Sequence, residues 1–289
     1  MRTSPAGEPG TCGWTVQQTE RGFFAGVPPR LFGHRGAAAV LPENTLPSFR
    51  RAVQDGAGYF ELDVHCTADD HVVVIHDATV DRTTDGAGPV SGFSLRELQR
   101  LDAGYRFQAA DGTLPARGQG VTVPTLREVV DLSDDLRLNI EIKPSDPSVA
   151  RRVVELLVSW GVADRVLVAS ARDDVVAALR PLCARYGIPT NFAAGEVAEF
   201  VGRVTEGRLA DYRPAGAALQ VPPEWHGIAV ITEATVAAAH ALGIEVHAWT
   251  INTVTEMEYL LGLGIDGIMT DLPALGRDTI ARHVQRRSQ

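Results

Sequence analysis

The feature that most constrains the fold is a regular alternation of short apolar runs and helix-length amphipathic segments. Between residues 136 and 271, short apolar runs that end in polar residues alternate with helical patterns, and the last apolar run ends the series. Two similar apolar runs, at residues 31–36 and 59–65, come before this series, and a helical segment at residues 43–54 separates them. Alternating strands and helices are typical of a parallel sheet that is covered by helices.

With these two runs included, the sequence predicts eight parallel strands. Eight such units over about 250 residues have the size of a TIM (β/α)8 barrel. An open, doubly wound sheet is the alternative, but no G-x-G-x-x-G pattern follows an early strand, so a dinucleotide site is not indicated. We therefore predict an irregular lead-in at residues 1–28 and a single TIM-barrel domain at residues 29–289. The predicted strands are residues 31–36, 59–65, 136–143, 166–171, 190–195, 217–223, 245–252 and 267–271.

The regular pattern breaks after an extra apolar run at residues 72–77, which we expect to form a hairpin with residues 59–65. The following stretch is rich in turn residues and contains a short helical segment in which Ser94 and Glu97 have capping-box spacing. Thr125 and Glu128 repeat that spacing at the next helix. Because long loops inside a compact domain are usually functional or disordered, we predict that residues 78–124 are a small insertion beside the barrel mouth.

Composition excludes several classes of partner. A net charge of −9 with no basic stripe argues against nucleic acid. No run approaches the 18 or so apolar residues of a membrane span, and the first 22 residues lack the apolar centre of a secretory leader. Cys12, Cys66 and Cys183 are widely spaced, which suggests neither a disulfide framework nor a zinc site. We predict a cytoplasmic protein; the sequence does not indicate its oligomeric state.

Acidic residues interrupt two of the predicted strands. Glu61 and Asp63 lie two residues apart in an apolar run, so strand geometry places them on one face. Glu141 and Lys143 share a face of residues 136–143 in the same way. Buried carboxylates need neutralisation, either by a divalent cation or by an ion pair with Lys or Arg from a neighbouring strand. Both explanations are compatible with these residues taken alone.

The position of the charged residues in a barrel favours the cation. Active sites of TIM barrels lie at the C-terminal ends of the strands, and the polar residues of this chain gather at those ends. Three inward carboxylates in one place cannot all remain charged without a nearby cation. The residues at the predicted mouth are His34, Arg35, Glu61, Asp63, His76, Asp77, Glu141, Lys143, Trp249, Asn252 and Asp271.

These residue types are suited to phosphoryl transfer. The all-oxygen ligands Glu61, Asp63 and Glu141 favour Mg²⁺ or Ca²⁺ over zinc. The two histidines at strand ends can take a proton from an attacking hydroxyl and protonate a leaving alkoxide. A bound cation, Arg35 and Lys143 would offset charge on the phosphoryl oxygens. For the other six histidines we expect structural roles, although alternation could direct His65 and His247 into the barrel.

The motifs GHRG, PENT, ELDVH, VVIHD, EIK, WTIN and GIMTD occur in this order between about residue 31 and residue 275. The ordered set resembles the glycerophosphodiester phosphodiesterases, which implies a TIM barrel with a small insertion after the second histidine. The resemblance implies that His34 and His76 are the general acid and base, and that Glu61, Asp63 and Glu141 bind a divalent cation. It also implies that Arg35 and Lys143 hold the phosphate and that Trp249 lines the pocket.

The resemblance further implies a small-molecule substrate, namely a deacylated phospholipid such as glycerophosphocholine or glycerophosphoethanolamine. Hydrolysis would give glycerol 3-phosphate and an alcohol. Ala171 departs from the aromatic residue that the family pattern leads us to expect, which would widen the pocket and leaves the headgroup open.

Two alternatives keep the barrel and change its role. Enzymes of the lysophospholipase D or sphingomyelinase D type act on acylated lipids and need an apolar channel or an interfacial patch. The sequence offers no amphipathic helix rich in Lys and Trp, so we favour the lipid-free substrate. A non-catalytic barrel that binds phosphodiesters would be expected to lack a histidine or a carboxylate, and here both histidines and all three carboxylates are present.

Overall fold

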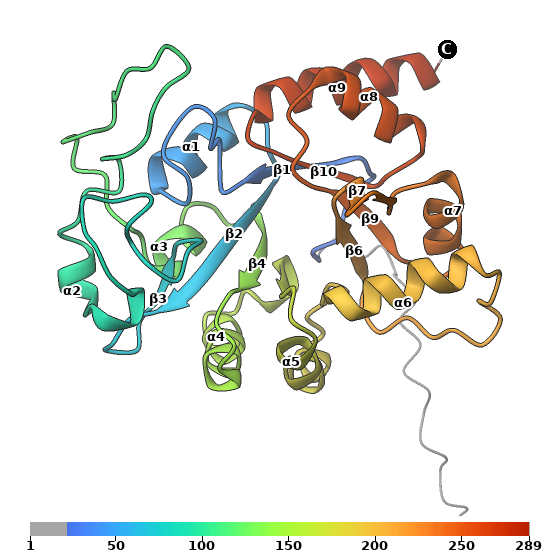
Figure 1. Cartoon of the computed structure of the whole chain (residues 1–289), viewed down its shortest axis with the longest axis horizontal. Helices are drawn as coiled ribbons and strands as arrows, with labels where there is room; N and C mark the ends of the chain where they lie inside the picture. The colour runs from blue at the N-terminus through green and yellow to red at the C-terminus, as the bar shows by residue number, and fades with distance from the viewer. Residues whose placement is uncertain (1–21, 289) are drawn as a thin grey trace, which may run out of the picture.

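A computed structural model describes residues 22–288 of the chain, and its centre is a curved sheet of parallel strands (Figure 1). Side chains alternate across each strand, so that Leu62 and Ile140 pack outward in the core under the helices, whereas Glu61 and Glu141 point inward. The strand order is β5-β4-β2-β1-β10-β9-β6. The strands are β1 (Arg30–His34), β2 (Tyr59–Cys66), β4 (Arg137–Ile142), β5 (Val166–Ala169), β6 (Ala218–Val221), β9 (Glu245–Ala248) and β10 (Gly267–Thr270).

The strand predicted at residues 190–195 is reduced to two bridging residues. Thr190 pairs in parallel with Val168 of β5, and Asn191 pairs in parallel with Ala218 of β6. The segment is short because α6 begins at Ala194, so the chain leaves the sheet almost at once. These bridges join β5 to β6, the two ends of the strand order, and thereby close the TIM barrel that the sequence predicts.

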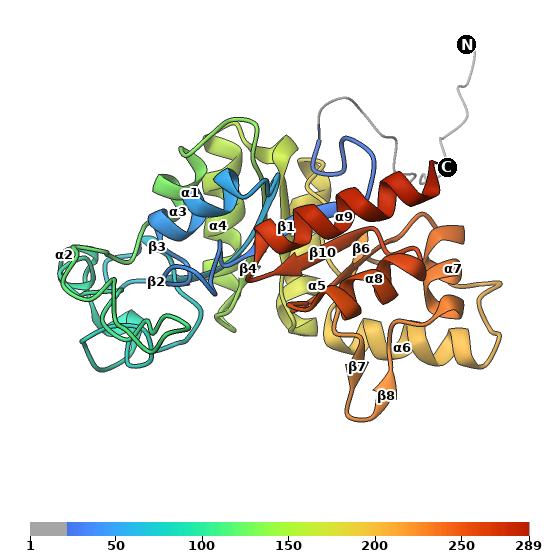
Figure 2. The same ribbon diagram turned by 90° about the horizontal axis from the view of Figure 1, so that it is seen from above.

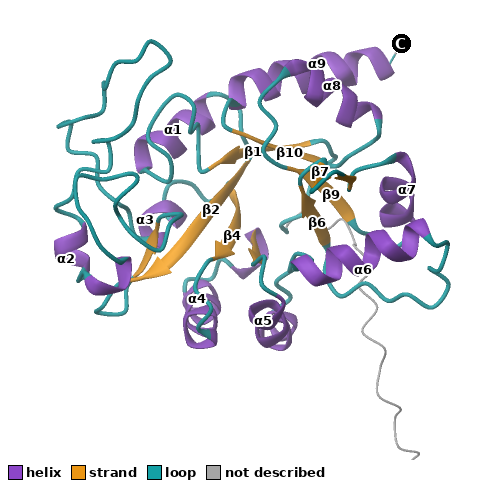
Figure 3. Ribbon diagram, in the orientation of Figure 1, coloured by secondary structure: helices purple, strands orange, loops and turns teal. Residues whose placement is uncertain are grey.

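Helices surround the barrel on its outside (Figure 3). Their apolar faces pack on the outward side chains of the strands, in two large clusters that contain residues such as Leu157 of α4 and Leu260 of α8. Among the described residues, no helix is long and apolar enough to cross a membrane. The helices are α1 (Leu46–Gln54), α4 (Pro147–Ser159), α5 (Asp173–Arg185), α6 (Ala194–Thr205), α7 (Glu233–Ala241), α8 (Val254–Gly262) and α9 (Pro273–Arg287).

Helix α1 begins later than the sequence pattern suggests. We expected it to start at Glu43, but Thr45 is the N-cap residue, and its hydroxyl accepts a hydrogen bond from the Ser48 amide. Asn44 has a φ of 56°, a left-handed conformation that a helix cannot contain. Glu43 and Asn44 therefore belong to the loop between β1 and α1, where their side chains are free to face the barrel mouth.

The expected hairpin after β2 is present. β3 (Val72–Val74) runs antiparallel to β2, with Val74 opposite Val64. The chain then forms long loops with a 3₁₀ turn, η1 (Val90–Gly92), and the short helices α2 (Leu95–Leu98) and α3 (Leu126–Val130) (Figure 3). Both predicted capping boxes are confirmed. The boundaries of the insertion at residues 78–124 stay a prediction.

Two features were not predicted from the sequence. One is the last helix, α9, and the other is a small hairpin of β7 (Glu224–Trp225) and β8 (Ile228–Ala229). His226 and Gly227 form its turn with φ values of 50° and 81°. Figure 2 shows that this hairpin projects away from the barrel beside α6.

Aromatic side chains fill the N-terminal end of the barrel. Phe23 is buried, and its ring centroid lies 5.4 Å from that of Tyr59 and 6.3 Å from that of Phe32. Phe23, which belongs to the predicted lead-in, therefore packs against the barrel. The rest of the predicted lead-in, up to residue 21 and including Trp14, lies outside the described residues.

Candidate active site

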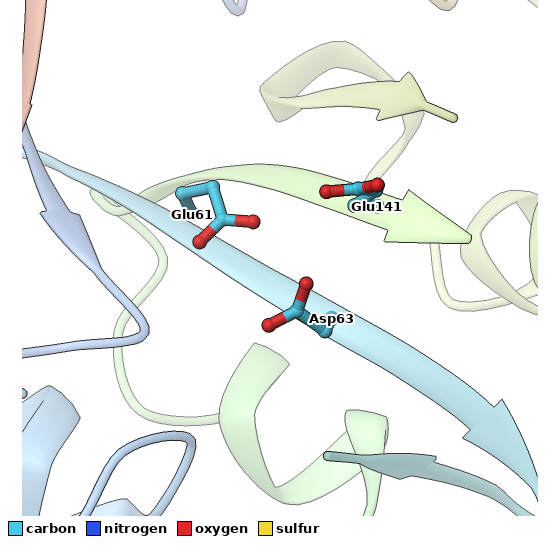
Figure 4. Close-up of side chains that lie close together, drawn as sticks. All are labelled: Glu61, Asp63 and Glu141. Carbon is cyan, nitrogen blue, oxygen red and sulfur yellow. The ribbon is translucent and has the colours of Figure 1, made fainter. Parts of the chain in front are cut away.

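Strand register brings the predicted site residues together at the C-terminal ends of β1, β2 and β4. His34 of β1 lies opposite Glu61 of β2, and Asp63 of β2 lies opposite Glu141 of β4. Because all four side chains point inward, the register places them side by side at the mouth. Figure 4 shows the carboxylates of Glu61, Asp63 and Glu141 directed toward a shared space.

The three carboxylates form a compact acidic cluster. One oxygen of each lies within 4.8 Å of the others, and Glu61 and Asp63 are buried. The Oε2 atom of Glu61 is buried and has no hydrogen-bond partner among the described residues. Burial and the charge of Asp63 raise the pKa of Glu61 to about 8. A buried carboxyl oxygen without a partner is costly, and a cation would remove that cost.

Two positively charged side chains, Lys143 and Arg35, reach this cluster but do not pair with all of its carboxylates. The Nζ atom of Lys143 lies 2.9 Å from Asp63 Oδ1 and 3.0 Å from Glu141 Oε2, and Arg35 Nε lies 3.3 Å from Asp63 Oδ2. Burial alone would raise the pKa of Asp63, but the charges of Lys143 and Arg35 lower it below its usual value. The ion-pair alternative thus accounts for Asp63 and Glu141.

Glu61 is the residue that ion pairing does not explain. Its only charged neighbour of opposite sign in pairing range is His34, whose Nε2 lies 3.8 Å from Glu61 Oε2, as far as the described part of the chain shows. The remaining negative charge and the all-oxygen donor set fit a hard divalent cation such as Mg²⁺ or Ca²⁺. Glu61, Asp63 and Glu141 could therefore hold one such ion.

His34 is oriented by the end of the last barrel strand. Its Nδ1 donates to Asp271 Oδ1 at 2.6 Å, and Asp271 Oδ2 accepts a hydrogen bond from Asn252 Nδ2 at 2.6 Å. The Asp271 amide in turn donates to Asn252 Oδ1. Burial would lower the pKa of His34, but the hydrogen bond with Asp271 and the charge of Glu61 more than offset this and raise it. Sequence analysis placed Asp271 at the mouth without giving it a role.

His76 is oriented by its sequence neighbour. Its Nδ1 donates to Asp77 Oδ1 at 2.6 Å, so the carboxylate positions the ring. Arg82 holds Asp77 in place, with Nε 2.7 Å from Asp77 Oδ2. Hydrogen bonds from Arg82 are the main reason that the pKa of Asp77 falls to about 2.

Arg82 was not predicted, and it links two parts of the site. Its guanidinium also binds both carboxylate oxygens of Glu43, at 2.7 and 2.8 Å. Glu43 accepts a further hydrogen bond from Arg35 Nη1 at 3.0 Å. On the other side of this loop, Asn44 Nδ2 donates to Asp63 Oδ2 at 2.9 Å. The PENT motif was the signal for Glu43 and Asn44; no comparable motif pointed to Arg82.

The mouth opens into one cavity of about 730 Å³. His34, His76, Glu61, Glu141 and Lys143 line it, and so does Trp249, which is 37% exposed. Arg35 and Asp63 are not among these lining residues in the described structure; the Arg35 side chain pairs with Glu43 and Asp63 and is 18% exposed.

Two of the remaining histidines, His65 and His247, make structural contacts with described partners. His65 Nε2 faces the carbonyl oxygen of His76 at 3.1 Å. His247 is fully buried inside the barrel and donates to Glu245.

A TIM barrel with two oriented histidines and an acidic cluster at the C-terminal strand ends has the layout of a barrel enzyme. The model of the glycerophosphoryl diester phosphodiesterase family matches residues 34–275, and the chain belongs to this family. The family and the fold predicted from the sequence are thus confirmed.

Individual relatives agree with this assignment. A glycerophosphodiester phosphodiesterase of Caldanaerobacter subterraneus is 32% identical over 248 residues, which are 84% of this chain and 94% of the relative. A lysophospholipase D of Mus musculus is 27% identical over 276 residues, covering 86% of this chain and 85% of that protein. The structure of an Oleispira antarctica phosphodiesterase in complex with the product sn-glycerol-3-phosphate superimposes with a TM-score of 0.69 at 27% identity, covering 88% of this chain and 97% of that one.

Proposed function

We propose that the chain hydrolyses glycerophosphodiesters, such as glycerophosphocholine and glycerophosphoethanolamine, to glycerol 3-phosphate and an alcohol. The observation that best supports this proposal is the pair of histidines, each held at Nδ1 by a carboxylate at 2.6 Å, on the wall of the cavity that contains the acidic cluster. Two fixed imidazoles beside a cation site suit the cleavage of a phosphodiester, which needs one proton removed and one supplied.

In this proposal the protein's own groups handle the protons. Because the Nδ1 atoms of His34 and His76 are engaged, Nε2 is the atom of each ring that exchanges a proton with substrate. One ring takes a proton from the attacking hydroxyl and the other protonates the departing oxygen. Asp271 and Asp77 keep the rings in the tautomer that this requires and stabilise the imidazolium that forms.

The phosphate would lie between these rings and Lys143, which reaches the cavity surface, with Trp249 forming part of the wall. Arg35, whose Nε lies 3.3 Å from Asp63 Oδ2, would hold the phosphate together with Lys143. When bound by Glu61, Asp63 and Glu141, a divalent cation would offset charge on the phosphoryl oxygens.

The reaction class is tested by removing the cation. We expect purified protein to release glycerol 3-phosphate from glycerophosphocholine, to lose this activity in excess chelator, and to regain it with Mg²⁺ or Ca²⁺. The ion that restores the higher kcat/KM identifies the preferred cofactor. Activity that survives exhaustive chelation would contradict the role of the acidic cluster, and well-folded protein without activity under any ion would contradict the proposed function.

The acid–base pair is tested by replacing each histidine. We expect His34→Ala and His76→Ala each to lower kcat by about 10²- to 10⁴-fold, the usual contribution of general acid–base catalysis. His283→Ala on α9 is the matched control and should retain full activity, because the cavity does not include it. Unchanged turnover in His34→Ala would instead contradict the catalytic assignment of this histidine.

A further inference from the structure

The cavity at the mouth has two chemically different halves. Its charged lining residues, the histidines, Glu61, Glu141 and Lys143, come from the strand ends and the hairpin of β2 and β3. The other half is lined by apolar side chains of α6, namely Val197, Ala198 and Val201, which we call the α6 wall. The one charged residue on this half is Glu206, which pairs with Arg208 at the end of the helix.

The β7–β8 hairpin supplies the opposite side of the apolar half. Trp225 and Ile228, which we call the hairpin rim, line the same cavity as the α6 wall and are 57% and 63% exposed. Large apolar side chains that remain exposed together at the edge of a cavity commonly mark a site where an apolar ligand binds. Figure 2 shows the hairpin projecting beyond the barrel, so the rim extends the cavity outward from the strand ends.

Small residues leave this half open. Ala171 follows β5 and lines the cavity where the family pattern led us to expect an aromatic side chain. Ala169 and Ala198 also line it, next to the larger side chain of Phe192. A volume of about 730 Å³ is within the ~300–1,000 Å³ that encloses drug-sized ligands. Glycerol 3-phosphate and a small alcohol at the charged end would leave the apolar half unfilled.

We propose that the apolar half binds the acyl chain of a lysophospholipid, so that the substrates of this enzyme include phosphodiesters carrying one fatty acyl chain. The inference rests on the proposed function, because the phosphodiester must lie at His34, His76 and Lys143. The charged half suits the phosphate, and the adjoining α6 wall suits a single hydrocarbon chain that continues from it. The α6 wall and the hairpin rim would then form an apolar channel. We did not expect such a channel from the sequence, which led us to favour a lipid-free substrate.

The reaction remains a hydrolysis. With lysophosphatidylcholine, the oxygen of water forms a bond to phosphorus, the bond from phosphorus to the choline oxygen breaks, and that oxygen takes up a proton. The products are lysophosphatidate and choline, and neither an oxidant nor a second substrate is needed.

The experiment compares glycerophosphocholine with lysophosphatidylcholines that carry hexanoyl, octanoyl and decanoyl chains, all below their micellar concentrations and with the activating cation present. Choline is released from every substrate, so one assay measures all of them. Burial of a methylene strengthens binding by about fourfold at most. We therefore expect kcat/KM to rise with chain length, by at least about tenfold between glycerophosphocholine and the decanoyl ester.

Two variants locate the chain. Ala198→Trp places an indole on the α6 wall. In this variant, kcat/KM for the decanoyl ester should be about the same as kcat/KM for glycerophosphocholine, so that the ratio of the two values is close to one. Ile228→Ser at the exposed hairpin rim should lower the same ratio. This second variant keeps the test valid if the tryptophan disturbs folding. Ala237→Trp, an exposed position on α7 outside the cavity, is the matched control and should retain the wild-type ratio.

The outcomes separate the two proposals. Release of choline from glycerophosphocholine with no gain for the acyl series overturns the acyl site and leaves the proposed function intact. A wild-type ratio in both Ala198→Trp and Ile228→Ser also overturns the acyl site. Absence of choline from every substrate, with well-folded protein and either cation, overturns the proposed function itself.

Discussion

At the scale of single residues, Asp271 connects the last barrel strand to His34, one of the two proposed acid–base residues. The residue directly follows β10, and its carboxylate is fixed on one side by Asn252 and on the other by the histidine Nδ1. We expect Asp271→Asn to lower kcat on the order of 10²-fold with little change in KM. The amide keeps the shape but removes the charge that stabilises the imidazolium and orients the ring.

Steady-state kinetics with glycerophosphocholine would measure this split between kcat and KM. Asp278→Asn on α9 is the control, because its carboxylate pairs only with exposed Arg277 among the described residues. A parallel loss in both variants would indicate general damage to the C-terminal part of the chain. Full activity in Asp271→Asn would show that His34 needs no carboxylate partner.

The site residues on strands were predictable from the sequence because strand alternation is regular. Glu61 and Asp63 had to share a face, and so did Glu141 and Lys143, before any register was known. The roles of Asp271 and Arg82 depend on which loops meet at the mouth. The periodic patterns of strands and helices in the sequence do not show which loops these are. The assignment of Arg35 to the phosphate stays a prediction; in the structure Arg35 pairs with Asp63 and Glu43.

At the scale of elements, Arg82 ties the segment after β3 to the loop between β1 and α1. One guanidinium binds Asp77, which orients His76, and Glu43, which contacts Arg35. We expect Arg82→Ala to lower kcat/KM by about tenfold, because losing the clamp frees Asp77 and Glu43, although partial exposure of this pairing limits the effect. Arg82→Lys should recover only part of the loss, because one ammonium cannot bind two carboxylates in the same bidentate way.

Kinetics with glycerophosphocholine again provides the measurement, with Arg100→Ala as the control from the same stretch of chain. Arg100 is exposed and makes no side-chain hydrogen bond among the described residues. Equal activity of wild type and Arg82→Ala would mean that the barrel alone positions His76.

The elements that sequence analysis missed are those too short to show a period. A strand of two residues, as at Thr190 and Asn191 or in β7 and β8, cannot display alternation, so the closing strand was predicted too long and the hairpin was not predicted. The capping boxes at Ser94 and Thr125 succeeded because capping depends on only four residues. The cavity depends on how α6 and that unpredicted hairpin face each other, which is why an apolar channel was not expected.

At the scale of the whole molecule, the barrel separates a chemical end from a stabilising end. The N-terminal end of the strands carries an ion pair between Arg30 and Glu245, with 2% and 12% of their side chains exposed and 2.7 Å between the closest atoms. Arg30 also donates to the hydroxyl group of Tyr59, and His247 donates to Glu245. We assign this ion pair a role in the stability of the barrel, because the residues of the candidate site lie at the other end of the strands.

This arrangement predicts how stability depends on pH. Burial alone would raise the pKa of Glu245, but hydrogen bonds from Arg30 and His247 outweigh it and lower the pKa to about 2. A carboxylate with a lowered pKa contributes its stabilisation fully above its unfolded value, near 4.3, and loses it as the pH falls toward 2. We expect Glu245→Gln to lower the free energy of unfolding at pH 7 by about 3 kcal/mol, since it leaves Arg30 buried without its partner.

Urea unfolding at pH 7, 5, 4 and 3 would measure the difference between wild type and Glu245→Gln. The difference should be constant from pH 7 to pH 5 and shrink below pH 4, without vanishing at pH 3, because pH 3 is still above the pKa of about 2 that Glu245 has in the folded protein. Glu155→Gln, an exposed position on α4, should show no comparable difference at any pH. A deficit of Glu245→Gln that stayed constant down to pH 3 would mean that packing, and not the charge of Glu245, stabilises this end of the barrel.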